Sequence, residues 1–131
     1  MKRILLITII LIVLVACAKK DEDEEITYKS VSMEEGIKLM STLDAFMLLD
    51  VRTAEEYAQG HIPAAMNYPN EDIGDQELSI LPDKEISILV YCRSGRRSKE
   101  AASKLAKLGY KNIIEIGGII DYPYELQKLV P

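Results

Sequence analysis

Apolar runs alternate with amphipathic segments along most of the chain. The apolar runs predict five β-strands, at residues 26–30, 46–51, 66–68, 86–91 and 113–116. The segments between and after them predict helices, at residues 33–40, 54–59, 71–81 (a weak pattern), 99–108 and from 117 to about 129. Apolar strands separated by helices are typical of an α/β fold, in which a five-stranded parallel sheet carries helices on both faces.

The turn after the fourth predicted strand carries the strongest chemical signal. It leads directly into the helix expected at 99–108, and it reads Cys92-Arg93-Ser94-Gly95-Arg96-Arg97-Ser98. Backbone N–H groups of such a turn converge on one point, and the helix N-terminus adds partial positive charge, so an anion should bind there. The same groups, with the three arginines, favour the thiolate of Cys92. The alternative is a small, buried and inert cysteine.

Polar side chains also follow the second predicted strand. Asp50 and Arg52 lie at its carboxyl end, the edge at which parallel sheets bind their ligands. We expect these two residues to support the cysteine turn, either by bracing it or by pairing with its arginines. The spacing from Arg52 to Glu56 also suits a local ion pair. His61, the only histidine, is expected to hydrogen-bond the backbone and fix a turn.

Composition narrows the classes of function. The formal charge is −5 over 131 residues, and no block is rich in Lys and Arg, which argues against a nucleic-acid binder. The arginines gather instead in the turn at 93–97, where they suit a small anion. With one histidine and two cysteines, Cys17 and Cys92, no set of residues has metal-ligand spacing, so we expect neither a metal nor another cofactor.

The N-terminus has the pattern of an export signal. Lys2 and Arg3 precede an apolar run, residues 4–15, that is too short for a transmembrane helix but suits the core of a signal peptide. The run ends in Leu14-Val15-Ala16-Cys17, which resembles the lipobox of bacterial lipoproteins. The alternatives are an uncleaved membrane anchor, or an ordinary signal peptide with an accidental cysteine.

The lipobox resemblance implies that residues 1–16 are removed and that Cys17 is lipidated. Residues 18–25, of sequence AKKDEDEE, cannot bury enough apolar surface to offset their ordering entropy. Residues 17–25 are therefore expected to form a disordered tether, followed by one folded domain at 26–131. We expect an exported, membrane-anchored lipoprotein that faces the periplasm or the cell exterior, with no disulfide between its two cysteines.

Three motifs together point to a family. The first motif is the set Leu48-Leu49-Asp50-Val51-Arg52, Glu55-Glu56-Tyr57, Gly60-His61-Ile62-Pro63 and Ala65. The second is the turn at 91–98, and the third is Ile116-Gly117-Gly118. In this order and at this spacing they resemble the rhodanese superfamily over about residues 30–130. Ala64 and Tyr122 depart from its usual glycine and tryptophan, as tolerable packing changes. The resemblance implies a single-domain rhodanese-like fold and sulfur transfer through a cysteine persulfide.

The length of the turn separates the reactions known in this superfamily. Phosphatase relatives have a C-x5-R loop, whereas here Arg97 follows Cys92 after four residues, and Ser98 stands at the C-x5-R position. The shorter turn has room for one extra sulfur atom on Cys92. The resemblance therefore favours a sulfurtransferase over a phosphatase or an arsenate reductase.

The sequence thus predicts a catalytic Cys92 within a substrate-binding turn. Its thiolate attacks a donor such as thiosulfate, and a thiol or cyanide then takes the sulfur. Arg93 and Arg96 are expected to guide the anionic donor, and the amides of residues 94–97 to stabilise the terminal sulfur. Gly95 is expected to supply a backbone conformation or a close approach that a side chain would block. Arg97 either contacts the substrate or turns inward to brace the turn.

Two function classes remain open for such a domain. The first is a thiosulfate-type sulfurtransferase whose partners are a small anionic donor and a thiol acceptor. The second is an exported sulfur carrier, or binding module, that passes persulfide sulfur to a protein partner and turns over small donors poorly. In either case we expect a monomer that contacts the membrane through its lipid anchor.

Overall fold

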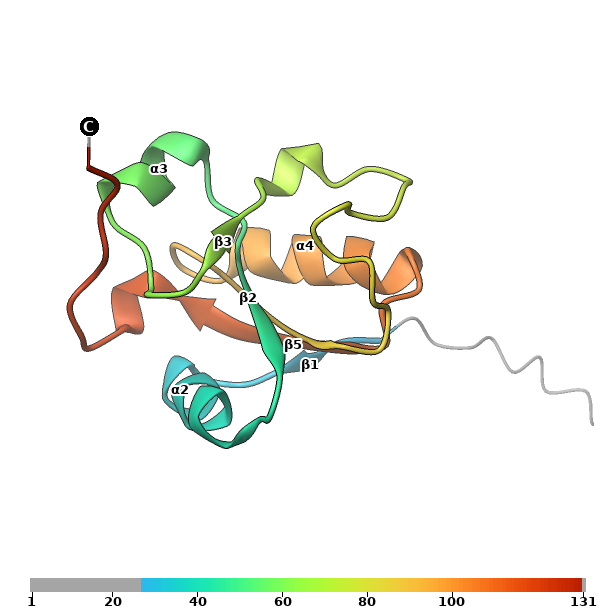
Figure 1. Cartoon of the computed structure of the whole chain (residues 1–131), viewed down its shortest axis with the longest axis horizontal. Coiled ribbons are helices and arrows are strands. Elements are labelled where there is room, and N and C mark those ends of the chain that lie inside the picture. Colours follow the sequence, from blue (N-terminus) through green and yellow to red (C-terminus); the bar gives the residue numbers. More distant parts are fainter. Residues whose placement is uncertain (1–26, 131) are drawn as a thin grey trace, which may run out of the picture.

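A parallel β-sheet lies at the centre of residues 27–130, the part of the chain that the computed structural model describes (Figure 1). Its five strands follow the order β1-β5-β4-β2-β3, and every neighbouring pair is parallel. The strands are β1 (Lys29–Ser30), β2 (Phe46–Asp50), β3 (Met66–Asn67), β4 (Ser87–Cys92) and β5 (Asn112–Gly118). The predicted α/β fold class is confirmed.

Strand β4 occupies the middle of the sheet because its sequence is apolar on both faces. From Ile88 to Cys92 every residue is at most 1% exposed, as expected for a parallel strand covered on both sides. The edge strands β1 and β3 are only two residues long. The carboxyl ends of the central strands, which carry Asp50 and Cys92, therefore meet at one edge of a well-buried core.

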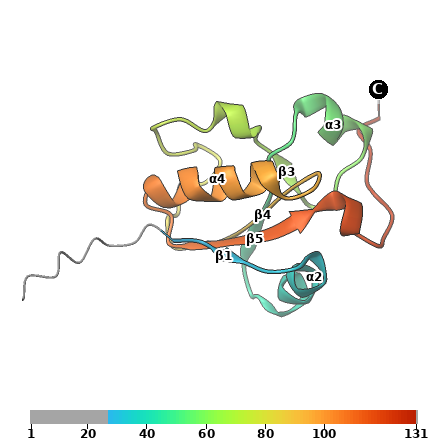
Figure 2. The ribbon, with the colours of Figure 1, turned by 180° about the vertical axis from the view of Figure 1, so that it is seen from behind.

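Helices cover both faces of the sheet, as the sequence predicts (Figures 1 and 2). Helix α4 (Arg96–Lys107) packs on one face through Ala101, Ala102 and Leu105, which are fully buried. Helix α2 (Met33–Thr42) lies on the opposite face, where Met33 joins the second apolar cluster. A third, short helix, α3 (Ala54–Gln59), follows the carboxyl end of β2.

Polar side chains cap the starts of α2 and α3. The Ser32 hydroxyl accepts a hydrogen bond from the Glu35 amide at 3.2 Å. Thr53 and Glu56 form a reciprocal capping box, in which each side chain accepts from the other's backbone amide. Gly60 ends α3 as predicted.

The helix predicted weakly at 71–81 is wrong. Only a single 3-10 turn, η1 (Asn70–Asp72), forms there, and an irregular segment follows it. This segment is held by Tyr110, whose hydroxyl accepts from the Leu78 amide at 3.0 Å and donates to the Leu81 carbonyl at 2.7 Å. Contacts with a distant side chain thus replace the hydrogen bonds of a helix. Leu78 and Leu81 are buried although they lie in no helix.

The helix predicted from residue 117 to about 129 is also wrong. Gly117 and Gly118 belong to β5, and only the 3-10 turn η2 (Ile119–Asp121) follows. Pro123 has no N–H to continue a helix, and it restricts the preceding Tyr122 to an extended conformation. The chain then runs across to His61, whose backbone exchanges two hydrogen bonds of 2.9 Å with Gln127.

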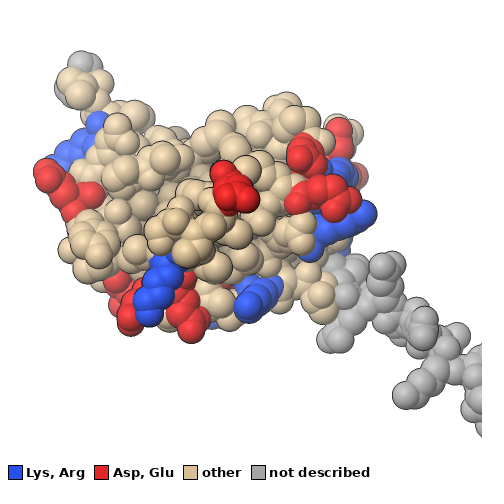
Figure 3. Space-filling model, turned by 60° about the horizontal axis from the view of Figure 1, so that its bottom comes forward, with Lys and Arg blue, Asp and Glu red and all other residues tan. Residues whose placement is uncertain are grey.

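Charged groups on the surface are mixed in sign. On the face shown in Figure 3, Lys and Arg lie scattered among Asp and Glu, and no continuous basic stripe crosses the described residues there. Within residues 27–130, none of the helices has the length and apolar character that crossing a membrane requires. The predicted signal peptide, Cys17 and the tether at 17–25 lie outside the described residues.

Strand β5 ends directly against the cysteine turn. A Cβ added to Gly118 would lie 2.1 Å from the carbonyl oxygen of Arg93 and 2.6 Å from the Cα of Ser94. The Ile120 amide also donates to that carbonyl oxygen, at 3.3 Å. The end of β5 and the turn are therefore in backbone contact that only glycine allows.

Replacing Gly118 by alanine should consequently displace the turn. Overpacking against backbone atoms costs roughly 1–3 kcal/mol of unfolding free energy, and we expect slower alkylation of Cys92 as well. Urea unfolding and thiol alkylation measure the two effects. Gly74→Ala is the matched control, because no atom lies within 4 Å of its added Cβ. Equal behaviour of the two variants would contradict this interpretation.

Candidate active site

Cys92 is the last residue of β4 and lies under the turn that leads into α4. The residue is 1% exposed. Gly95 takes a positive φ of 111° and caps α4, so the helix begins at Arg96, three residues earlier than Lys99, the predicted start. The Gly95 amide donates to the Cys92 sulfur at 3.0 Å. The turn thus directs an amide and a helix N-terminus at the sulfur.

These contacts decide the protonation of the thiol. Burial raises the pKa of Cys92, but hydrogen bonds from the Ser98 hydroxyl and from the amides of Ser98, Gly95 and Ser94 outweigh it. The net pKa lies below the ordinary value for a cysteine. A lowered pKa increases the fraction of the nucleophilic thiolate at neutral pH.

Two buried residues near the sulfur were given no role from the sequence. The Ser98 hydroxyl lies 3.4 Å from the Cys92 sulfur and 2.6 Å from Oε1 of Glu115. Glu115 is 2% exposed although it stands in the otherwise apolar strand β5. That exception in an apolar run is the signal by which Glu115 could have been found.

The three arginines of the turn separate in space. Arg93 is exposed and lines the cavity described below. Arg96 is 75% exposed and pairs with Glu100 at 2.8 Å along the same helix. Arg97 turns away from solvent and forms two hydrogen bonds with Glu56, at 2.7 and 3.0 Å. Of the two roles left open for Arg97, this geometry favours bracing the turn.

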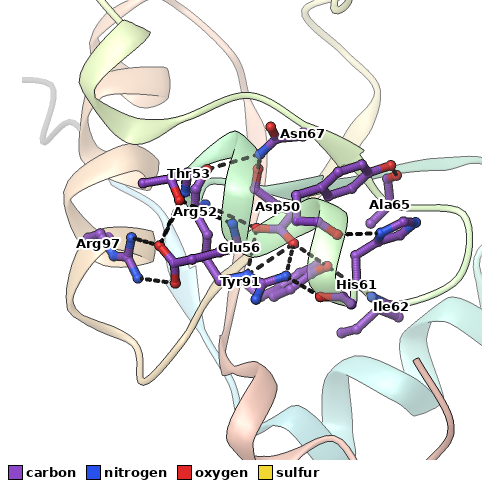
Figure 4. A network of polar contacts seen from close by, with 12 residues as sticks. Asp50, Arg52, Thr53, Glu56, His61, Ile62, Ala65, Asn67, Tyr91 and Arg97 are labelled. Atoms are coloured by element: carbon purple, nitrogen blue, oxygen red, sulfur yellow. Dashed lines mark hydrogen bonds and ion pairs between the residues drawn. The ribbon is translucent and has the colours of Figure 1, made fainter. Parts of the chain in front are cut away.

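Asp50 and Arg52 form the centre of a buried polar network (Figure 4). Arg52 Nη2 contacts Asp50 Oδ2 at 2.6 Å and donates to the carbonyl oxygen of Gly60 at 2.7 Å. The hydroxyl of Tyr91 donates to Asp50 at 2.7 Å and accepts from the amide of Ile62 at 3.1 Å. The network fixes the end of β2 against β4 and against the turn after α3.

The network corrects two expectations about pairing. Asp50 binds Arg52 rather than an arginine of the turn. Arg52 does not pair with Glu56, because Glu56 lies against Arg97 instead. His61 behaves as expected, since its Nδ1 lies 2.8 Å from the carbonyl oxygen of Tyr57 and its ring stacks on that of Tyr57.

A cavity of about 380 Å³ opens beside the turn. Its charged lining residues are Arg52, Arg93 and Glu56, and its apolar wall consists of Ile119, Ile120 and Leu126. Within residues 27–130, no group of three or more His, Cys, Asp or Glu side chains could hold a metal ion. The fold and the site therefore define an α/β protein with one buried cysteine of lowered pKa, next to a cavity that Arg93 of the same turn lines.

Comparison with known proteins agrees with this class. Residues 32–121 match the Rhodanese-like domain, and the chain belongs to this family. Thiosulfate sulfurtransferase PspE of Escherichia coli (strain K12) is 36% identical over 73 residues, which cover 56% of this chain and 70% of that protein. A protein of Allochromatium vinosum named Sulfurtransferase is 39% identical over 84 residues, which cover 63% of this chain and 76% of that protein.

A solved structure described as "rhodanese with anions from E. coli" shares the fold. Its TM-score is 0.59 at 33% sequence identity, and the match covers 65% of this chain and 100% of that one. Together, these relatives support sulfur transfer as the general function of the family member described here.

The Glu56–Arg97 pair should make stability depend on pH. The hydrogen bond from Arg97 holds the pKa of Glu56 at about 2, below its ordinary 4.5. A lowered pKa in the folded state stabilises the fold above about pH 4.5, and this contribution disappears as the pH falls towards 2. Because the pair is partly exposed, we expect Glu56→Gln to lose about 1–2 kcal/mol at pH 7.

Urea unfolding at a series of pH values measures this difference. Glutamine can retain the capping box with Thr53, so the comparison isolates the ion pair. The gap between Glu56→Gln and the unmodified protein should close as the pH falls from 4.5 towards 2. Glu55→Gln, on the exposed side of α3, should show no such gap. A gap that persists unchanged at low pH would refute the role of the pair.

Proposed function

We propose that this protein is a sulfurtransferase of the thiosulfate type, which moves sulfane sulfur through a persulfide on Cys92. The observation that carries the proposal is the buried Cys92 sulfur, whose pKa is lowered by hydrogen bonds from the Ser98 hydroxyl and from the amides of the turn. The names of the relatives PspE and Sulfurtransferase support it. No metal or other cofactor is needed for this chemistry.

The proposed reaction has two steps. The Cys92 thiolate attacks the outer sulfur of thiosulfate, the S–S bond of the donor breaks, and sulfite leaves with the bonding electron pair. The new persulfide carries its negative charge on the terminal sulfur, where the amides of the turn stabilise it. A thiolate or cyanide then attacks that sulfur, and the Cys92 thiolate is regenerated.

Arg93 and Arg96 are the proposed guides of the anionic donor. Both guanidinium groups are exposed at the turn, and Arg93 also lines the adjacent cavity. Arg96 shares its charge with Glu100, whereas no such ion pair holds Arg93 among the described residues. Arg93 therefore contributes more of the positive potential that an approaching thiosulfate meets.

Replacing Cys92 by serine should abolish sulfur transfer from thiosulfate to cyanide, because the hydroxyl fits the space but forms no persulfide. The assay is complemented by the mass of the intact protein after thiosulfate treatment. The unmodified protein should gain the mass of one sulfur atom, and Cys92→Ser should gain none.

Each other outcome has a definite meaning. Transfer activity retained by Cys92→Ser would overturn the proposal. Persulfide formation on Cys92 without turnover of small acceptors would instead identify the sulfur carrier that the sequence left open. Arg97→Lys is a companion variant that tests whether Arg97 braces the turn. Lysine keeps the positive charge but lacks the planar guanidinium that forms two hydrogen bonds with Glu56.

We further propose that the domain is an exported lipoprotein anchored through Cys17. The basic start, the short apolar run and the sequence Leu14-Val15-Ala16-Cys17 support this proposal. A diacyl anchor is sufficient for stable attachment to a membrane. The acidic residues that follow Cys17 would give no electrostatic attraction to anionic lipids.

Replacing Cys17 by alanine should therefore release the protein from the membrane fraction or block its maturation. Fractionation of expressing cells, with intact mass of the recovered chain, measures both. Cys92→Ser serves as the control, since it removes the other cysteine and should leave the protein attached. An alanine variant that still matures and stays bound would rule out the lipid anchor.

A further inference from the structure

The cavity beside the cysteine turn is larger than the proposed donor requires. Its volume is about 380 Å³, whereas one water molecule in the liquid takes roughly 30 Å³. Sites for organic ligands span about 300–1,000 Å³ and combine apolar walls with a few polar groups. Thiosulfate and cyanide are ions of a few atoms, and neither fills such a space. The remaining reactant of the proposed reaction is the thiol that accepts the sulfur.

The apolar wall of the cavity continues onto the surface of the protein. Ile119 and Leu126 are partly buried, whereas the side chain of Ile120 is 64% exposed. Exposed apolar side chains that gather beside a site indicate a contact surface for a partner. Five large apolar residues are exposed in the described part of the chain, and four of them follow β5: Ile120, Tyr124, Leu129 and Val130.

The segment after β5 crosses from the cysteine turn to α3 (Figures 1 and 2). Backbone hydrogen bonds hold both ends of this path. The Ile120 amide donates to the carbonyl oxygen of Arg93 at 3.3 Å, and the Leu129 amide donates to that of Ala58 at 3.2 Å. The apolar wall is therefore fixed in position next to the turn.

One positive charge on the cavity wall is left uncompensated. Arg52 binds Asp50 at 2.6 Å, and Glu56 binds Arg97 at 2.7 Å, so the charges of these two lining residues are neutralised. In the described part of the chain, no carboxylate forms an ion pair with Arg93. An acceptor that carries a carboxylate complements this charge. Sulfite leaves before the acceptor reacts, so the same arginine can serve the donor first and the acceptor second.

We propose that this cavity binds the sulfur acceptor, and that the acceptor is a cysteine in an extended segment of a protein, flanked in its sequence by an apolar and an acidic residue. The apolar side chain packs against Ile119, Ile120 and Leu126, and the carboxylate binds Arg93. Because the residue Cys92 is only 1% exposed, a flat protein surface does not reach its sulfur, and the partner inserts a segment instead.

The purpose of the site rests on the proposed persulfide. The acceptor thiol first loses its proton to water. Its thiolate attacks the outer sulfur of the Cys92 persulfide, the S–S bond breaks, and the Cys92 thiolate leaves with the bonding electron pair. The products are a persulfide on the partner and the regenerated Cys92 thiolate, so atoms and charge balance.

The first test requires no sulfur transfer. The probe is a capped tripeptide of leucine, serine and aspartate, in which serine replaces the reactive cysteine, and the reference is a capped tripeptide of serine, serine and lysine. Each is titrated into the unmodified protein while the backbone amides are followed by NMR. The probe should shift the amides of Arg93, Ile119 and Ile120 in a saturable way, and the reference should shift them much less. Equal shifts with both peptides, or none at these amides, would overturn the proposal.

The second test measures the transfer to the acceptor alone. Cys92 is loaded with thiosulfate, the excess donor is removed, and the loss of the added sulfur is followed by intact mass. The two peptides now carry cysteine at the central position. Each rate constant is divided by that of the same peptide with a small aromatic disulfide, which corrects for differences in thiol reactivity. The leucine peptide should be favoured by about tenfold or more, as burial of one leucine side chain allows.

A pair of serine variants locates this preference. In Ile120→Ser it should fall about fivefold or more, because the apolar wall is interrupted. Tyr124→Ser is the matched control and should retain the preference. Tyr124 is 63% exposed in the same segment, but it lines a separate hollow with Glu34 and Ile37. Both positions are exposed, so both variants should fold.

Each other result has a definite meaning. An unchanged preference in Ile120→Ser would overturn the proposal. Equal rates for the two peptides and for free cysteine would also overturn it, and would identify small thiols as the acceptors. If Cys92 takes up no sulfur while the NMR shifts are as expected, the result counts against the proposed function alone.

Discussion

The convergence of amide hydrogens on one sulfur atom is the interaction on which the rest of this structure depends. A buried thiol would normally retain its proton, because desolvation disfavours the thiolate. Here Ser98, in the first turn of α4, and the amides of Gly95 and Ser94 supply enough donors to reverse that preference. The reversal requires a left-handed backbone at Gly95 and a strand end without side chain at Gly118. Gly95 and Gly118 thus allow the backbone arrangement in which the pKa of Cys92 is lowered.

A second polar system fixes the position of the turn. Asp50, Arg52 and Tyr91 are buried at the carboxyl ends of β2 and β4, and both Arg52 and Tyr91 donate hydrogen bonds to Asp50. Arg97 anchors the start of α4 to Glu56 on α3. The Tyr91–Asp50 bond joins β4 to β2, and the Arg97–Glu56 pair joins α4 to α3, so charged hydrogen bonds as well as packing hold this edge of the sheet together. Such an edge holds the amides in place before a substrate arrives.

The sequence predicted those features that depend on local pattern. The apolar run of β4, the arginine-rich turn and the caps of α2 and α3 are all readable within a few residues, and the fold class followed from them. The failure at 71–81 depends on a distant partner, because the hydroxyl of Tyr110 shapes that segment and no periodicity within it carries that information. The failure at 117–129 is different. Pro123 was a local signal against a helix there, and only the backbone bridge from Gln127 to His61 had to come from the structure.

The site residues show the same difference between features set by the local sequence and features set by distant contacts. The position of Cys92 at a strand end was predictable from the apolar run before it and the amphipathic segment after it. The need for a glycine at residue 95 was also predictable, but its positive φ came from the structure. The partner of Arg97 lies 41 residues away in sequence, and Glu115 meets Ser98 across 17 residues and two elements. Neither pairing leaves a trace in the local pattern except for one acidic residue in an apolar strand. Side-chain pairing between elements had to come from the structure.

The parallel order of the strands also fixes a direction in space. β1 runs parallel to β5, so the described chain enters at the amino edge of the sheet, whereas the cysteine turn lies at the carboxyl edge (Figure 1). The point at which the described chain begins and the cysteine turn therefore lie at opposite edges of the sheet. An attachment through the N-terminal segment would join the domain at the edge opposite the turn, and would leave the approach to the turn unobstructed.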